Sequence, residues 1–436
     1  MRFIADFHIH SKYSRAVSQD MVPEELDRWA DDKGILVMGT GDFTHPAWLK
    51  ELKQKLEPAE PGLYRLKASY KKPTINGVPA ATRFILSVEI SCIYKRGGKT
   101  RRVHNLILAP DFETVDKINA QLSLIGNLKS DGRPILGLDS EELLKIVLNS
   151  NPQAVLVPAH AWTPWFSVFG SMSGFDTLEE CFGDHTKHIF AIETGLSSDP
   201  AMNWRLSKLD KIAFISNSDS HSLERIGREA NVFDTGLSYT GIMEALRSRD
   251  PKKFLLTIEF FPEEGKYHYD GHRVCNIVWE PAQTKKNNGK CSVCGKPVTV
   301  GVVNRVDALA DRPLRQSEGV GAGLARQIVS EGRVPFVNLV TLDKIIGDAL
   351  DVGPASKSVK KEYDKLIKAC RSEFNILMNV ESKDLAGVAS PEIIEGINRV
   401  RAGKLHIRPG YDGEYGEINI FTDADRKKIT SQVSLF

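Results

Sequence analysis

The chain opens with MRFIADFHIH, residues 1–10, and this stretch predicts both the fold and a metal site. Phe3–Phe7 is a strand-like apolar run, and His8 and His10 follow it directly. Because side chains alternate along an extended chain, the two rings point the same way and could bind one ion. The stretch lacks the basic and then apolar pattern of a secretion signal, so we expect a cytoplasmic protein.

Strand-like and helical segments alternate through the first 260 residues or so. Six further strand-like runs are Ile35–Met38, Phe84–Val88, Val103–Leu108, Ala154–Val157, Ile189–Ile192 and Ile212–Ile215. Helical stretches between them are Pro23–Asp32, Phe112–Leu124 and Ser140–Asn149. This rhythm predicts an α/β fold with a parallel sheet or barrel, and seven strands before residue 220 favour the barrel. Residues 57–79 are punctuated by Pro and Gly, which is typical of a surface insertion.

Candidate metal ligands lie at the ends of these strands. They are His8, His10, Asp42, Glu89, His104, His160, Asp219 and His221, with Glu193 an open case. In a β/α barrel the strand ends converge on one face, so residues far apart in sequence meet there. Imidazoles mixed with carboxylates suit Zn²⁺, Mn²⁺ or Fe²⁺ better than Mg²⁺. His45, His185 and His188 lack a partner at a useful spacing, and we interpret them as ordinary polar residues.

The ordered motifs resemble those of the PHP (polymerase and histidinol phosphatase) superfamily over roughly residues 1–250. The resemblance implies a distorted seven-stranded β/α barrel with two or three divalent ions, Zn, Mn or Mg. One ion would be held by His8, His10, Glu89 and Asp219. Glu89 would bridge to a second ion, held also by His104 and His160. We expect Asp219, His10 and Lys12 to have catalytic roles.

A third site would include His221, but the sequence departs from the superfamily pattern there. The family often has His directly after the Asp of the second motif, and Phe43 stands at that position. Asp42 and His45 are the candidates to replace it.

Two ions about 3.5–4 Å apart can activate a water and stabilise both the attacking and the leaving oxygen at a phosphorus atom. Lys12 and Arg15 could neutralise a phosphate, or could be solvated loop charges.

Four residues predict a structural zinc site outside the barrel. His272 and Cys275 form one pair with two residues between them, and Cys291 and Cys294 form another. This spacing is typical of a closed four-ligand site, although His268 could replace His272. Three other cysteines, Cys92, Cys181 and Cys370, are scattered and are interpreted as ordinary thiols.

The C-terminal region is expected to be mostly helical and to bind an anionic partner. Helices are predicted at Gly323–Ser330, Leu342–Ala349, Lys357–Glu373 and Pro391–Ala402. Residues 281–436 hold 24 Lys and Arg against 19 Asp and Glu, which favours an anionic partner but also fits a solvated mixed-charge surface. Gly319 and Gly321, followed by Ala325 and Ile328, fit a helix-hairpin-helix motif, although an ordinary glycine-rich helix start is favoured.

The last five residues resemble the motif by which bacterial proteins bind the replication sliding clamp. Gln432, Leu435 and Phe436 would be the anchors in a small hydrophobic pocket. The alternative is a tail that packs its own Leu and Phe locally. The motif is of the bacterial type, so we expect a bacterial source.

Barrel, zinc module, helical region and tail, in that order, resemble the endonuclease Q family over essentially the full length. The implied domains are 1–255, 256–304, 305–431 and 432–436. The family cuts DNA 5′ to deaminated bases (uracil, hypoxanthine, xanthine) or abasic sites and leaves a 3′-hydroxyl and a 5′-phosphate. The resemblance thus implies a DNA partner, a sliding-clamp partner and a nucleoid location, and we expect a monomer.

Reading a damaged base requires that it be flipped out of the stack into a pocket. Candidate pocket residues follow His160 directly: Trp162, Trp165, Phe166, Ser171 and Ser173. The same residues would also suit a packed loop. Two alternative functions remain open, a small-molecule phosphatase of the histidinol-phosphate type and a non-catalytic clamp-bound lesion sensor.

Overall fold

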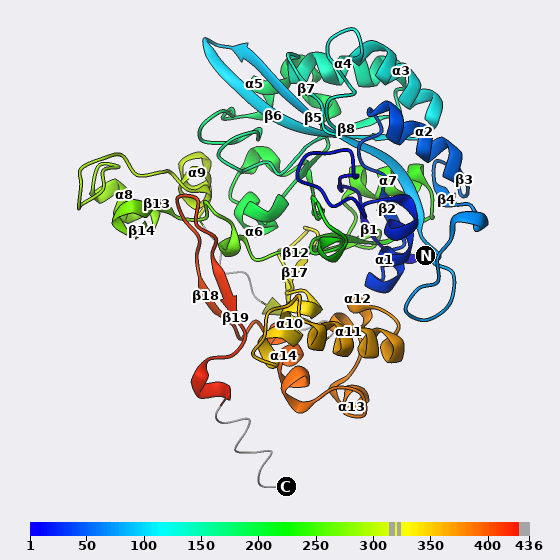
Figure 1. The fold of residues 1–436 in the computed structure, drawn as a ribbon. Helices are drawn as coiled ribbons and strands as arrows, with labels where there is room; N and C mark the ends of the chain where they lie inside the picture. Colours follow the sequence, from blue (N-terminus) through cyan, green and yellow to red (C-terminus); the bar gives the residue numbers. More distant parts are fainter. Residues whose placement is uncertain (314–318, 321–323, 427–436) are drawn as a thin grey trace.

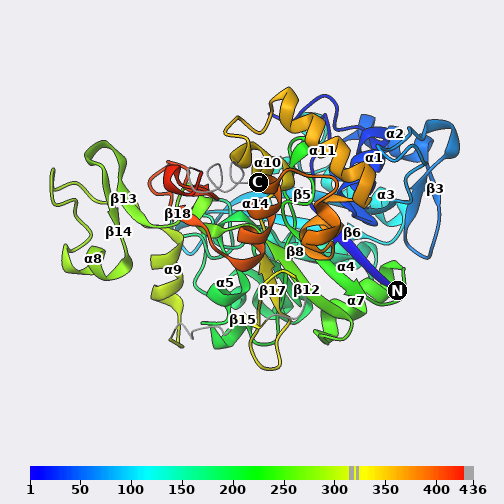
Figure 2. The same ribbon diagram turned by 90° about the horizontal axis from the view of Figure 1, so that it is seen from below.

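The computed structural model describes residues 1–313, 319–320 and 324–426. Figure 1 shows a large sheet surrounded by helices, a smaller helical unit formed by α10–α14, and an arm formed by α8, β13 and β14. Seen after a 90° turn in Figure 2, the arm still projects away from the sheet. Within the described ranges, no helix is both long and apolar enough to cross a bilayer.

The sheet is mixed, which corrects the expectation of a parallel sheet. The strands β1 (Arg2–Asp6), β2 (Val37–Gly39) and β5 (Arg83–Arg96) pair in parallel within it, and β9 (Ala191–Glu193) and β10 (Ala213–Ile215) form a separate two-stranded parallel sheet. Antiparallel pairs join β5 to β6 (Lys99–Ala109) and β6 to β8 (Val155–Pro158). The strand β11 (Ala230–Asp234) runs antiparallel to both β1 and β12 (Phe254–Glu259). The α/β class is confirmed.

One long hairpin accounts for the antiparallel pairing of β5 with β6. The strand predicted at Phe84–Val88 continues to Arg96, where Gly97 and Gly98 form the turn into β6. Both glycines have positive φ, 60° and 73°, as a two-residue hairpin turn requires. The glycine pair is therefore the local signal that reverses the chain and lays β6 back along β5.

Helices in the first half largely match the predictions. They are α1 (Pro23–Lys33), α3 (Phe112–Leu122) and α4 (Ser140–Ser150), whereas α2 (Pro46–Lys55) and α7 (Tyr239–Ser248) were not predicted. The side chains of Asp111 and Asp139 cap α3 and α4 by accepting backbone N–H bonds. The expected insertion at 57–79 holds two short strands, β3 (Leu56–Pro58) and β4 (Tyr64–Leu66), which extend the sheet beyond β5.

The C-terminal helices are α10 (Leu342–Ala349), α11 (Lys357–Cys370), α12 (Glu373–Met378), α13 (Ser382–Leu385) and α14 (Pro391–Ala402). The helix predicted over 357–373 breaks at Arg371, where φ is 77°, and Ser372 then caps α12. Two predicted helices, α10 and α14, have the expected bounds. Two short strands, β18 (His406–Arg408) and β19 (Glu417–Asn419), follow as a hairpin.

The helix predicted over 323–330 is wrong where the structure describes it. Gln327–Ile328 is the short strand β16, which pairs with β15 (Gly319–Val320) and β17 (Phe336–Asn338). The Arg326 N–H donates to the carbonyl of Arg401, so tertiary pairing replaces the helical hydrogen bonds. Gly321 and Gly323 lie outside the described residues, but a helix-hairpin-helix motif needs a helix across Ala325 and Ile328, where the structure has a bend and β16, so that interpretation is wrong.

A buried ion pair fastens the helical unit to the sheet domain. The Lys33 ammonium at the end of α1 lies 2.7 Å from a carboxylate oxygen of Glu373, and both side chains are buried. The same carboxylate accepts hydrogen bonds from the Tyr363 hydroxyl and the Leu342 N–H. Apolar residues of both units form one continuous core around this pair.

Removing this carboxylate is expected to destabilise the protein strongly. Glu373→Ala would leave the Lys33 charge buried without its partner, at a cost of about 3–5 kcal/mol. Denaturant unfolding measures the loss. Glu381→Ala, at an exposed ion pair with Lys383, is the control and should change stability by less than about 0.5 kcal/mol. Equal effects of the two substitutions would contradict the prediction.

Candidate active site

Two groups of metal-ligand side chains meet at one end of the sheet. His8, His10, Glu89 and Asp219 form the first, and Glu89, His104 and His160 form the second, with the ligand atoms of each group within 4.8 Å of one another. Glu89 belongs to both groups. The structure thus assembles the residues that the superfamily resemblance assigns to two neighbouring ions.

The antiparallel hairpin is what places His104 beside Glu89. Glu89 lies on β5 and faces Leu106 of β6, two residues away from His104. The Nδ1 atom of His104 lies 2.7 Å from Glu89 Oε1, and His160 Nε2 lies 3.0 Å from the same oxygen. On a parallel strand His104 would stand near the far end of the sheet, so the chain reversal is essential to the site.

The first group has imidazole nitrogens aimed at two carboxylates. His10 Nε2 lies 3.0 Å from Asp219 Oδ1 and 3.3 Å from Glu89 Oε2. His8 Nε2 is 3.7 Å from both of these oxygens, is fully buried and has no hydrogen-bond partner among the described residues. A buried nitrogen without a partner, facing two carboxylates, fits a divalent cation.

The protonation states of three ligands also suit metal binding, whereas neighbouring carboxylates outweigh burial and raise the pKa values of His8, His10 and His160. Burial lowers the pKa of His104 to about 4, so its imidazole is neutral near pH 7, as a ligand must be. Burial works to raise the pKa of Glu89, but His104 and Arg133 outweigh it and hold that pKa well below its usual range. The pKa of Asp219 is lowered against the effect of burial, chiefly by its hydrogen bond to His10. Both carboxylates are therefore ionised.

Two further carboxylates stand behind the histidines. Glu193 Oε1 and Oε2 lie 3.0 and 3.1 Å from His8 Nδ1, and Asp42 Oδ1 lies 3.2 Å from His10 Nδ1. A carboxylate on one ring nitrogen orients the other nitrogen toward a metal. Asp42 was predicted as a ligand, but it belongs to neither group; its Oδ2 accepts hydrogen bonds from Ser11 and Ser14.

Glu193 also holds the group of Glu89, His104 and His160 in place, because its carboxylate accepts a hydrogen bond from the backbone N–H of His160. We expect Glu193→Gln to weaken metal binding by about 10–100-fold, since the amide loses the charge that polarises His8. Metal titration of the purified variant measures this. Glu141→Gln, at a carboxylate that pairs with Arg96 and His185 on the surface, is the control. Unchanged metal affinity in Glu193→Gln would contradict the assignment.

Left-handed backbone conformations gather at this site. Asp42, His160 and Asp219 have φ of 50°, 29° and 46°, a region that residues other than glycine rarely occupy. Such conformations cluster at functional sites, where the surrounding structure holds them. The three residues all lie in the segments that follow strands β2, β8 and β10.

The described residues form no third metal group in the site. His221 Nδ1 lies 2.9 Å from the Asp219 carbonyl oxygen, and its side chain is partly exposed. Phe43 is fully buried in the core, and His45 stacks on Tyr13 with ring centroids 4.3 Å apart. Phe43 stands where the superfamily often has a His ligand, and neither Asp42 nor His45 takes the place of that ligand.

The predicted phosphate-neutralising residues point elsewhere. Lys12 pairs with Glu51 at 3.0 Å, and Arg15 pairs with Asp131 at 3.3 Å and is mostly exposed. A cation that was not predicted, Arg133, instead lies 2.9 Å from Glu89 Oε2. Its position follows from the fold of the loop before β7 (Ile135–Leu136), which no sequence spacing indicated.

The candidate base-pocket loop divides into two parts. Trp162 is fully buried and donates to Asn203 Oδ1, and the Ser173 hydroxyl bonds backbone atoms, so both support the loop itself. Phe166 lies against the ring of His104, with centroids 4.8 Å apart, and Trp165 contacts Tyr267. Ser171 Oγ is buried and has no partner in the described structure. Trp165, Phe166 and Ser171 thus remain candidates for base contacts.

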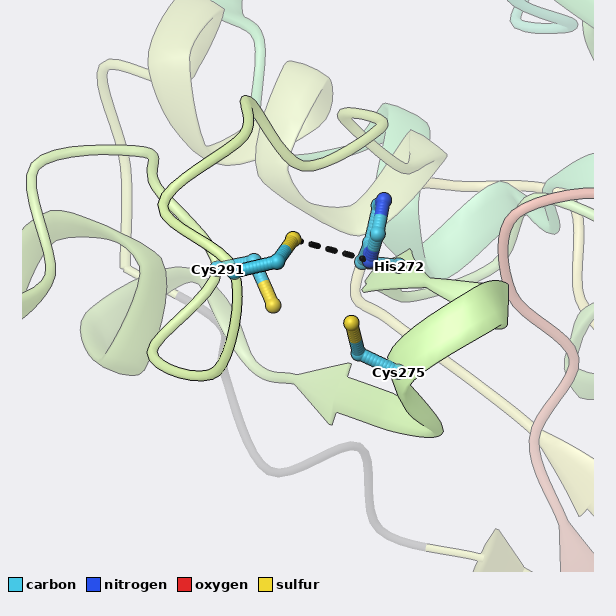
Figure 3. A group of neighbouring side chains, drawn as sticks. His272, Cys275 and Cys291 are labelled. Atoms are coloured by element: carbon cyan, nitrogen blue, oxygen red, sulfur yellow. Dashed lines mark hydrogen bonds between the residues drawn. The ribbon is translucent and has the colours of Figure 1, made fainter.

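The four predicted zinc ligands come together in the projecting arm. Figure 3 shows His272, Cys275 and Cys291 pointing toward one another, and Cys294 Sγ lies 3.7 Å from His272 Nδ1. The first pair comes from β13 (Asp270–His272) and the turn that follows it. The second comes from a knuckle closed by hydrogen bonds from Cys291 N to Lys296 O and from Gly295 N to Cys291 O. His268 is outside the group.

Comparisons with known proteins agree with this geometry. Residues 341–404 match the family model described as the MJ0043 C-terminal domain. The chain is 29% identical over 436 residues to the uncharacterised protein YqxK of Bacillus subtilis (strain 168), covering 96% of this chain and 99% of that one. It is 30% identical over 267 residues to the uncharacterised protein MJ0043 of Methanocaldococcus jannaschii, where the match covers 60% of this chain but spans only 31% of that relative.

Two solved structures match nearly the whole chain, each with a TM-score of 0.81 and 30% identity. One is the lesion-specific endonuclease PfuEndoQ of Pyrococcus furiosus, where the match covers 96% of this chain and 95% of that one. The other is an endonuclease Q in complex with a 27-mer duplex substrate that has an abasic lesion at the active site, covering 98% of both chains.

A mixed α/β fold with a shared His and carboxylate cluster defines the class, a metal-dependent hydrolase. The match in sequence and structure extends over the sheet domain, the arm and the helical unit alike. The chain belongs to the endonuclease Q family.

Proposed function

We propose that this protein is a DNA repair endonuclease that hydrolyses the phosphodiester 5′ to a deaminated base or an abasic site. The observation that carries the proposal is Glu89, which is shared by two metal-ligand groups in a chain that matches a lesion-bound endonuclease over 98% of its length. Two adjacent ions can stabilise both the attacking and the leaving oxygen when a phosphodiester is hydrolysed. The products would be a 3′-hydroxyl and a 5′-phosphate.

The residues present fit two divalent ions, which would be Zn, Mn or Mg. His8, His10, Glu89 and Asp219 would hold one, and Glu89, His104 and His160 the other. Such ions, when bound, activate water and stabilise charge at phosphorus. His10 and Asp219 would be the catalytic side chains, while Glu193 and Asp42 keep the imidazoles oriented. The strands would form a distorted seven-stranded barrel around this centre.

The arm has the charge expected of a DNA contact. Residues 266–300 hold six Lys and Arg against two Asp and Glu. Arg273, Lys286, Lys290 and Lys296 are exposed on it. The helix that follows the arm is tied to the base-pocket loop, because Arg305 of α9 (Val302–Leu309) donates to the carbonyl of Phe169 in that loop. A zinc ion in the arm would fix these cations relative to the cleavage centre.

The remaining assignments extend the proposal along the chain. Residues 1–255 would be the hydrolase, 256–304 the zinc module and 305–431 a DNA-binding region. Trp165, Phe166 and Ser171 would receive the flipped base beside His104. The tail anchors Gln432, Leu435 and Phe436 lie outside the described residues, and their binding to a sliding clamp rests on the sequence motif alone.

Cleavage of defined duplexes tests the proposal. Duplexes containing uracil, hypoxanthine, an abasic site or no lesion are incubated with the protein and Mg²⁺, Mn²⁺ or Zn²⁺. The expected result is a metal-dependent nick 5′ to each lesion and none in the undamaged duplex. Release of phosphate from small monoesters without any nick would overturn the proposal in favour of a phosphatase. Binding without cleavage in all metals would favour a lesion sensor.

A further inference from the structure

We propose that Arg133 is a catalytic residue that binds the scissile phosphate beside the two metal-ligand groups. This inference rests on the proposed function, because it concerns the phosphodiester that the site would cleave. Arg133 lies outside every motif considered above, and nothing in the sequence around it predicts contact with the centre. The structure alone brings it there.

The guanidinium stands at the centre of the site. Arg133 Nη1 donates to Glu89 Oε2 over 2.9 Å, the oxygen that His10 Nε2 also approaches at 3.3 Å. A guanidinium is not deprotonated in proteins, so the group stays cationic. Its side chain is 30% exposed, whereas that of Glu89 is fully buried. The arginine therefore spans from the buried carboxylate to solvent.

The loop that carries Arg133 is built to hold it. Gly132 packs so closely on the second motif that a Cβ at this position would lie 2.2 Å from Asp42 Oδ2. Hydrogen bonds from Gly132 N to Tyr13 O and from Ser91 N to Pro134 O anchor both sides of the residue. Asp131 Oδ1 accepts a hydrogen bond from the backbone N–H of Arg133. An ordinary surface arginine needs no such support.

Charge and donor count point to an anionic ligand. A guanidinium offers five N–H donors in a planar fork, and in the described structure Glu89 is the one side-chain acceptor for that of Arg133. Two divalent ions together with this guanidinium would carry more positive charge than Glu89 and Asp219 neutralise, so the site favours a further anion. The non-bridging oxygens of a phosphodiester satisfy both requirements, and their charge grows as hydrolysis proceeds.

Binding to a neutralised phosphate tests this role directly. Two duplexes with a stable abasic-site analogue are compared in buffer without added metal and without chelator, so that the arm keeps its zinc; one has the normal phosphate 5′ to the lesion and one has an uncharged methylphosphonate there. The wild type is expected to bind the methylphosphonate duplex about tenfold more weakly. Arg133→Gln should bind both equally. Arg65→Gln, at an exposed ion pair with Glu57, is the control and should keep the tenfold preference.

Hydrolysis of bis(4-nitrophenyl) phosphate gives a second readout that needs no lesion. Arg133→Gln should slow it by about 10²-fold, and Arg133→Lys should recover part of the rate because one charge returns without the fork. If Arg133→Gln keeps the methylphosphonate preference and loses metal instead, the residue only positions Glu89 and the proposal is overturned. A wild type that hydrolyses the diester but cuts no lesion duplex would refute the proposed function, and the diester rates would still decide the role of Arg133.

Discussion

Replacement of Glu89 by glutamine is expected to reduce DNA cleavage by roughly 10⁴-fold, because this one carboxylate serves both metal-ligand groups. Its Oε1 faces His104 and His160, and its Oε2 faces His8 and His10. A neutral amide would remove the negative charge between two cations and leave each group one anionic ligand short. Cleavage of an abasic duplex under single-turnover conditions measures the rate, and elemental analysis measures the metal content.

A second buried glutamate supplies the matched control. Burial and the nearby carboxyl of Glu259 raise the pKa of Glu229 well above its usual range, which favours the neutral form of this carboxyl. Glu229→Gln imitates that neutral form, and it should retain the wild-type rate and metal content. If Glu89→Gln cleaved at more than a tenth of the wild-type rate, Glu89 would not be the bridging ligand.

Loss of the Cys and His cluster is expected to unfold the arm while sparing the hydrolytic centre. The arm's own buried apolar residues are Trp279, Cys291 and Val298, with Cys275 and Ile277 packed against them, too few to sustain a fold alone. A structural zinc ion supplies about 10 kcal/mol or more to modules of this size. Replacement of Cys291 and Cys294 by serine should therefore release one zinc equivalent and expose residues 268–300 to limited proteolysis.

The functional consequence separates the arm from the catalytic centre. DNA binding should weaken by at least about tenfold, because the exposed Arg and Lys side chains of the arm lose their fixed positions. Hydrolysis of a small chromogenic diester should be unchanged, since His272, Cys275, Cys291 and Cys294 contribute nothing to the Glu89 groups. Cys370→Ser, in helix α11, is the control and should retain zinc and DNA affinity. A double serine variant that still resisted proteolysis would refute the structural role of the cluster.

Regular spacing made several features predictable. His8 and His10, like Cys291 and Cys294, are only a few residues apart. The local backbone geometry alone therefore makes the two side chains of each pair point the same way. Helices such as α1, α10 and α14 carry their own start and stop signals, which is why their bounds agree with the predictions to within a residue.

Other features depended on contacts that spacing does not encode. Asp42 stands at a strand end like the ligands, yet Ser11, Ser14 and His10 occupy its oxygens. Trp162 has the chemistry of a stacking platform but is buried in the core. Lys12 has the charge for a phosphate, but Glu51 pairs with it. In each case a long-range partner decided between two roles that the residue type allowed.

The sequence by itself therefore determined which residues could bind metal, that these candidate ligands fall in two separate regions, and that the chain alternates strands and helices. These properties follow from residue type and local periodicity, which act over a few residues. Only the tertiary structure decided that β6 runs antiparallel, that Glu89 is shared, that Asp42 and Glu193 stand behind the ligands, and that Arg133 reaches the site. Those outcomes depend on which distant segments pack together, because the free energy of burial and pairing is set by the whole fold.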